Sequence, residues 1–142
     1  MEINHILLSI RERTFSDFSA IALLCSPEST REMDWKFVSG NISTRYKKMK
    51  TFIGRGITGL VMQTGRPVVW DNQIPNIEHK RFQSAIMVGE NLIAAAAVPI
   101  KSENAIQGVL LIGCRSLRCY NKEDLNMLAE AAKKLAMTEI IQ

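Results

Sequence analysis

Residues 52–72 read FIGRGITGLVMQTGRPVVWDN. Three glycines open a short apolar segment that Gly65 closes, and this pattern predicts a short helix over Gly56–Gln63. A strand over Pro67–Asp71 is expected to follow at once. The glycine spacing also matches the dinucleotide-binding fingerprint, but that fingerprint needs a long helix and an acidic residue about 20 positions further on. A helix of barely two turns followed by a polar loop does not meet this requirement, so we reject a dinucleotide site.

The other predicted elements complete an α+β pattern. They are an amphipathic helix over 2–13, strands over Phe18–Cys25 and Trp35–Phe37, a loop over 73–79, a short helix over Lys80–Glu90, strands over Leu92–Ile100 and Ile106–Cys114, and a long C-terminal helix capped by Asn121. This order predicts one domain over residues 1–142, with an antiparallel sheet of five to six strands flanked by the N- and C-terminal helices.

The secondary structure of the segment over Leu92–Ile100 does not follow from residue propensity alone. The run over Leu92–Ile100 contains four alanines, which favour a helix, but its flanking turns and short length favour a strand on which another element packs closely. We expect it to pair antiparallel with Ile106–Cys114. Residues 45–50 carry four basic side chains and are predicted to be a loop, and the polar stretch from Pro27 is predicted to be a hairpin turn of moderate length.

The composition is that of a globular domain. Of 142 residues, 46% are hydrophobic and 23% are charged, and no apolar run is long enough for a membrane span. The N-terminal residues lack the pattern of a secretory signal, so we expect a cytoplasmic protein. The net charge of +4 comes partly from two basic clusters without interleaved aromatic residues, which favours a solvated loop or an acidic partner over nucleic acid.

The cysteines and histidines do not form a catalytic or metal-binding pattern. Cys25 and Cys114 end apolar runs and are expected to be buried, whereas Cys119 lies in a polar turn and is expected to be exposed. His5 and His79 are isolated and predicted to face solvent. The sequence therefore predicts neither a metal site nor a cofactor, and no catalytic residues.

Several motifs resemble the GAF domain family. They are the Gly56–Pro67 stretch, the strand ending Ala97-Val98-Pro99-Ile100, the Gly108–Gly113 strand and the start of the closing helix at Tyr120–Ala129. The resemblance covers nearly the whole chain. It implies a GAF/PAS-like twisted antiparallel sheet with a ligand cleft on one face and the terminal helices on the other.

Within this family the chain resembles the NreA-type nitrate receptors. The similarity lies in Trp35, in Ser39-Gly40-Asn41 and in Arg45-Tyr46-Lys47, together with the glycine turn. It implies a stand-alone small-molecule sensor that binds nitrate or another small anion and signals through a sensor histidine kinase. The stretch Phe82–Val88 lacks the aromatic or proline-rich character of those receptors apart from Phe82, which leaves the identity of the ligand open.

The residues themselves suggest how an anion could bind. A helix N-terminus attracts anions, so the amides of Ile57 and Thr58 are candidate donors, and Arg55 could add charge. The same glycines could equally form only a tight turn. Trp35 could offer its indole N–H or could be a plain core aromatic, whereas Trp70 is expected to be a packing residue.

By resemblance, three residues from the stretch above the sheet add backbone and apolar contacts to the pocket. These residues are Ala85, Ile86 and Met87.

Two alternatives belong to other functional classes. The first is a ligand-free interaction or dimerisation module, in which the apolar stripes Ile3/Ile6/Ile10 and Leu128/Leu135 pack between two chains rather than on their own sheet. The second is an enzyme similar to the free methionine-R-sulfoxide reductases, which use cysteines in the cleft. This chain has Thr58 and Ala94–Ala97 in the corresponding neighbourhoods, so a thiol cycle in the cleft is not supported.

Overall fold

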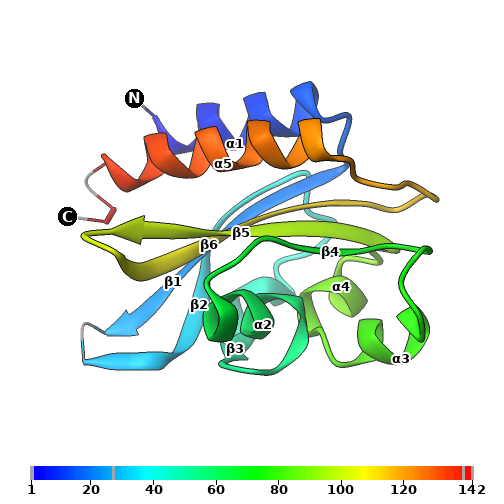
Figure 1. The fold of residues 1–142 in the computed structure, drawn as a ribbon, viewed down its shortest axis with the longest axis horizontal. Coiled ribbons are helices and arrows are strands. Elements are labelled where there is room, and N and C mark those ends of the chain that lie inside the picture. Colours follow the sequence, from blue (N-terminus) through cyan, green and yellow to red (C-terminus); the bar gives the residue numbers. More distant parts are fainter. Residues whose placement is uncertain (1, 27, 139, 142) are drawn as a thin grey trace.

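The computed structural model describes residues 2–26, 28–138 and 140–141 (Figure 1). In chain order its elements are α1 (Ile3–Arg13), β1 (Phe18–Ser26), β2 (Ser29–Ser39), the 3-10 helix η1 (Arg45–Lys48), β3 (Lys50–Phe52), α2 (Gly56–Thr64), β4 (Val68–Trp70), α3 (Ile77–Phe82), α4 (Ala85–Gly89), β5 (Ala94–Ser102), β6 (Ala105–Cys114) and α5 (Lys122–Ala136). None of the helices in these ranges is both long and apolar enough to cross a membrane.

The strands form one antiparallel sheet between two layers of helices. The sheet has six strands in the order β3-β2-β1-β6-β5-β4. Figure 1 shows α1 and α5 side by side on one face, and α2, α3 and α4 on the other. This arrangement confirms the predicted α+β fold, the antiparallel sheet and the flanking terminal helices.

Each face of the sheet carries its own core. On the α1/α5 face, Ile6, Ile10, Leu128 and Leu135 are buried against the sheet of the same chain, and Ile3 packs at their edge. The apolar stripes of the terminal helices are therefore part of the single-chain core. On the other face, the core joins strand residues to the inner sides of α2 and α4.

The alanine-rich segment is a strand because both of its faces are covered. Ala94 and Ala96 face the core under α1 and α5, whereas Ala95 and Ala97 face the core under α2 and α4. Backbone pairing with β6 over the whole strand outweighs the helical propensity of alanine. Helix α5 packs on this strand, as the small side chains predicted.

The closing helix begins at the predicted cap. The Asn121 side chain accepts a hydrogen bond from the Asp124 amide, and the Asp124 carboxylate accepts one from the Asn121 amide, both at 2.9 Å. This reciprocal capping box satisfies two amide donors that the first helical turn would otherwise leave unpaired.

Three local predictions are wrong. Lys50, the last residue of the loop predicted over 45–50, begins strand β3 instead, because residues 50–52 pair with Glu32–Asp34 of β2. The hairpin between β1 and β2 is tight, since Ser26 pairs with Ser29; the predicted turn residue Pro27 lies outside the described residues. The single helix over Lys80–Glu90 is two short helices that extend back to Ile77, because Ser84 has an extended backbone (φ −110°, ψ 100°).

Candidate functional site

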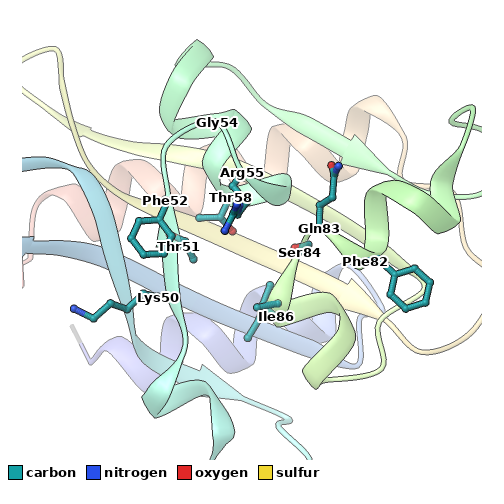
Figure 2. Close-up of a pocket in the computed structure, with 11 residues that line it drawn as sticks. Lys50, Thr51, Phe52, Gly54, Arg55, Thr58, Phe82, Gln83, Ser84 and Ile86 are labelled. Carbon is teal, nitrogen blue, oxygen red and sulfur yellow. The ribbon is translucent and has the colours of Figure 1, made fainter.

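A cleft of about 520 Å³ opens on the sheet face covered by α2 and α4 (Figure 2). Its walls come from β3, from the start of α2 and from the junction of α3 and α4. The lining residues are Lys50, Thr51, Phe52, Gly54, Arg55, Thr58, Phe82, Gln83, Ser84, Ala85 and Ile86. Figure 2 shows Arg55 and Thr58 on one side of the cleft and Ser84 and Ile86 on the other.

Gly56 brings the two walls together. It has a φ of +69°, and a Cβ atom there would lie 2.9 Å from the Gln83 carbonyl oxygen and 3.0 Å from the Ser84 Cα. Only glycine fits this close approach of backbone to backbone without strain. Gly59 plays a similar part inside the turn, since a Cβ there would collide with the Phe52 carbonyl oxygen.

Helix α2 presents free amides at the cleft. Its first intrahelical hydrogen bond runs from the Gly59 amide to the Arg55 carbonyl at 3.1 Å, so the amides of Gly56, Ile57 and Thr58 precede the hydrogen-bonded ladder. No side chain caps them. With the positive end of the helix dipole, these donors favour a negatively charged group.

Helix α4 adds a second set of donors. Its first hydrogen bond runs from the Val88 amide to the Ser84 carbonyl at 3.1 Å, which leaves the amides of Ala85, Ile86 and Met87 ahead of the ladder. No side chain caps this helix start either. Two helix N-termini without side-chain caps therefore meet at one cleft.

The wall of the cleft and the core behind it contain buried polar atoms without hydrogen-bond partners. In the described residues, three buried side-chain polar atoms have no hydrogen-bond partner: Trp35 Nε1, Thr58 Oγ1 and Glu90 Oε2. Thr58 lines the cleft and is 2% exposed, and Trp35 is 3% exposed in the adjoining core. An unsatisfied buried polar group costs about 1–3 kcal/mol, so the Thr58 hydroxyl and the Trp35 indole are candidates to contact a bound ligand, whereas Glu90 Oε2 is an acceptor that lies away from the cleft lining.

Comparisons with known proteins show the family of this chain. A family model described as GAF domain matches residues 2–138. The chain belongs to the GAF domain family. The comparison with curated proteins finds no match to this chain.

Solved structures of NreA are similar to this GAF domain in sequence and in fold. A Staphylococcus aureus NreA protein mutated in its nitrate binding site is 35% identical, with a TM-score of 0.72 over 83% of this chain and 86% of that one. A second such NreA structure is 31% identical, with a TM-score of 0.71 over 88% and 98% of the two chains. A free methionine-R-sulfoxide reductase from Neisseria meningitidis, at 20% identity and a TM-score of 0.71 over 92% and 71%, shares the fold.

The predicted site residues divide into two groups. Arg55, Thr58, Ala85 and Ile86 line the GAF cleft, and Arg55 is exposed at its surface. The side chains of Trp35, Ile57 and Met87 lie behind the lining, buried in the core between the sheet and helices α2 and α4, where Trp70 also packs.

Sequence reasoning missed the part of the cleft that β3 supplies. Lys50 falls in the predicted basic loop and no element is predicted for Thr51 and Phe52, so the edge strand that carries these three residues is not recognised from the sequence. Their pairing with β2 is a long-range contact that a three-residue segment does not reveal. Ser84 was also missed, since the break between α3 and α4 was not predicted.

Behind the cleft, Glu90 holds the far end of α4. Its side chain is fully buried, and Oε1 accepts hydrogen bonds from the Arg115 guanidinium and the Ile42 amide, both at 2.8 Å. Arg115 also donates to the Gly40 carbonyl at 3.0 Å. This network ties α4 to the end of β6 and to the loop after β2.

The cysteines lie away from the cleft lining. Cys114 is buried and Cys119 is exposed, as predicted. Cys25, predicted to be buried, is only partly buried, because it lies in the C-terminal part of β1, where the strand is less covered. Desolvation, with a smaller contribution from a hydrogen bond to Asp34, raises the pKa of Cys25 and so lowers its thiolate fraction. His5 and His79 are exposed, also as predicted.

Proposed function

We propose that this protein is a cytoplasmic, non-catalytic receptor that binds a small anion in the GAF cleft, with nitrate as the first anion to test. The observation that carries the proposal is the meeting of two uncapped helix N-termini at a cleft whose wall holds the unpartnered Thr58 hydroxyl. The NreA relatives, one of them 35% identical, have a nitrate binding site, and this supports nitrate as the candidate.

The chemistry of the lining favours an oxyanion over a cation. Backbone amides at the helix starts only donate hydrogen bonds, as does the indole N–H of Trp35 in the core behind the lining, and an oxyanion only accepts them. The charged residues among those that line the cleft, Lys50 and Arg55, are both basic, and in the described residues neither forms an ion pair. An anion would therefore find donors and positive charge without a competing carboxylate.

A receptor role is favoured over catalysis by the same lining. The described lining residues include hydroxyls and Lys50, but no Cys that could act as a thiol nucleophile and no His, Asp or Glu that could activate a hydroxyl as a general base. The likeness to the sulfoxide reductases is at 20% identity or below and concerns the fold.

We further propose that occupancy is reported to a separate signalling protein, most simply a histidine kinase. A ligand at the start of α4 contacts a helix whose other end is fixed by Glu90 to the surface loop at Gly40 and Ile42. The test is the autophosphorylation rate of a histidine kinase encoded in the same gene cluster, measured with this protein and with or without nitrate. A rate that does not depend on nitrate would argue against this partner while leaving the receptor function intact.

The receptor function is tested by nitrate titration with calorimetry and thermal unfolding. A ligand at about 100 times its dissociation constant stabilises the native state by about 2.7 kcal/mol. Trp35→Phe keeps the apolar packing but removes the indole donor, and Thr58→Val removes the hydroxyl at similar volume. Since a hydrogen bond to a charged group contributes about 1.5–3 kcal/mol, each variant should lose roughly 10- to 100-fold in nitrate affinity if its group contacts the anion.

Trp70→Phe is the matched control. Trp70 lies in the same core and is 6% exposed, but unlike Trp35 its indole nitrogen is not among the buried unpartnered atoms of the described residues, so this variant should bind nitrate as the parent does. Absence of nitrate binding by the parent protein would refute nitrate as the ligand. An equal loss in Trp70→Phe and Trp35→Phe would show that general loosening of the core, rather than a donor, explains the effect.

A further inference from the structure

The cleft is much larger than a nitrate ion. A four-atom oxyanion has the bulk of about two water molecules, roughly 60 Å³ at a share of ~30 Å³ each. The cleft measures about 520 Å³, within the range of roughly 300–1,000 Å³ that is typical of sites for organic ligands. An inorganic anion at the helix N-termini would leave most of this space to solvent.

The remaining space is flanked by aromatic side chains. Phe52 on β3 is 43% exposed and Phe82 at the end of α3 is 72% exposed, and both line the cleft. Figure 2 shows them on opposite sides of the opening, with Thr58, Ser84 and Ile86 between them. Exposed aromatic rings beside a concave site are typical of surfaces that bind apolar ligands.

We infer that the cleft has an outer subsite for the apolar body of an organic acid, whose carboxylate occupies the anion site at the start of α2, where the Thr58 hydroxyl is buried without a partner. The inference rests on the proposed anion-binding function and specifies the class of ligand. The body of the acid lies against Phe52 or Phe82 and Ile86, while the carboxylate accepts hydrogen bonds from the helix amides.

The charges around the cleft narrow this class further. Lys50 and Arg55 are basic, and the described lining contains no acidic residue. A ligand with a free ammonium group, such as an amino acid, would therefore have no counter-charge for its amine and would meet two like charges. The preferred ligand is a carboxylic acid without an amine.

Four probes separate these possibilities in calorimetric titrations of the full chain: nitrate, acetate, phenylacetate and phenylalanine. Nitrate and acetate report on the anion site alone, and phenylacetate adds an aromatic body. Phenylalanine keeps both groups but adds the amine. We expect phenylacetate to bind at least tenfold more tightly than acetate, and phenylalanine at least tenfold more weakly than phenylacetate.

Variants locate the added affinity. Phe52→Ala and Phe82→Ala remove exposed rings from the cleft and should lower phenylacetate affinity by a larger factor than acetate affinity. At least one of them should reduce phenylacetate affinity by about fivefold or more. Phe15→Ala is the control, since Phe15 is an 84% exposed phenylalanine that does not line the cleft, and it should change nothing.

The outcomes distinguish this inference from the proposed function. If acetate or nitrate binds but phenylacetate gains nothing, or if Phe15→Ala lowers its affinity as much as the cleft variants do, the outer subsite is refuted and the anion receptor stands. Phenylalanine binding as tightly as phenylacetate would refute the exclusion of amines. If neither nitrate, acetate nor phenylacetate binds, the proposed function itself fails.

Discussion

Replacing Gly56 by alanine tests whether the close approach of α2 to the 83–84 segment builds the anion site. The new Cβ would lie 2.9 Å from the Gln83 carbonyl oxygen and 3.0 Å from the Ser84 Cα, whereas ordinary contact begins at 3.4 Å. The two backbone segments must therefore separate by roughly half an ångström, the difference between these distances. Donors displaced by this amount at both helix starts should reduce anion affinity by about tenfold, or ~1.4 kcal/mol.

Gly54→Ala provides the control for backbone strain. Gly54 also has a positive φ, +82°, but its added Cβ would meet only the Gln63 side chain at 3.7 Å, an ordinary contact. Both variants should lose about 1–2 kcal/mol of stability from the left-handed backbone, a decrease of several degrees in Tm. Only Gly56→Ala should show the additional instability from the clash and the weaker anion binding.

The assay combines thermal unfolding without ligand and nitrate titration of both variants. Nitrate affinity of Gly56→Ala equal to that of the parent would show that the contact between the helix starts does not shape the site. A loss of affinity in Gly54→Ala as large as in Gly56→Ala would assign the effect to strain in the turn.

Three further predictions concern the scaffold. Glu90→Ala should lower the free energy of unfolding in urea by about 3–5 kcal/mol, because it leaves the Arg115 side chain partly buried without its ion-pair partner. The control, Lys36→Ala, breaks an exposed ion pair and should lower this free energy by less than ~1 kcal/mol. Equal losses in the two variants would contradict this account. Burial raises the pKa of Tyr120 well above its ordinary value of 10.0, so its contribution to stability is present below pH 10 and is lost as the pH rises beyond this. Between pH 8 and 11, the free energy of unfolding measured in urea should therefore decline less steeply in Tyr120→Phe than in the parent. Parallel curves for the two proteins would refute the assignment. Phe15, after the end of α1, has a φ of +54°, a left-handed conformation that glycine adopts at lower cost than phenylalanine. Phe15→Gly should therefore leave the free energy of unfolding unchanged or raise it by up to ~1 kcal/mol. A clear decrease in Tm would show that the exposed ring has a structural role.

Much of the fold could be predicted because its elements are long and periodic. Helix α1 and strands β1, β5 and β6 all appear within two residues of their predicted bounds, and helix α5 begins directly after its predicted cap at Asn121. The alanine run was assigned correctly since its flanking turns limited its length. The motif around Gly56 also placed one wall of the cleft in the correct element.

The failures share a physical cause. Strand β3 has three residues and exists only because β2 offers an edge with which it can pair. The division of α3 from α4 depends on one extended residue, Ser84, packed against the start of α2. Neither feature has a local period, so neither could be found by sequence pattern.

For the site, the sequence by itself determined which groups could donate hydrogen bonds: the glycine turn, the start of α2, and Trp35 as an indole on a neighbouring strand. Only the tertiary structure decided that a second helix start meets the first, that Thr58 and Trp35 are buried without partners, and that Phe52 and Phe82 flank a cleft of about 520 Å³. The reason is that donor type and helix propensity are properties of local sequence. Burial, the convergence of helix ends and the shape of a cleft arise from contacts between segments that are distant in the chain.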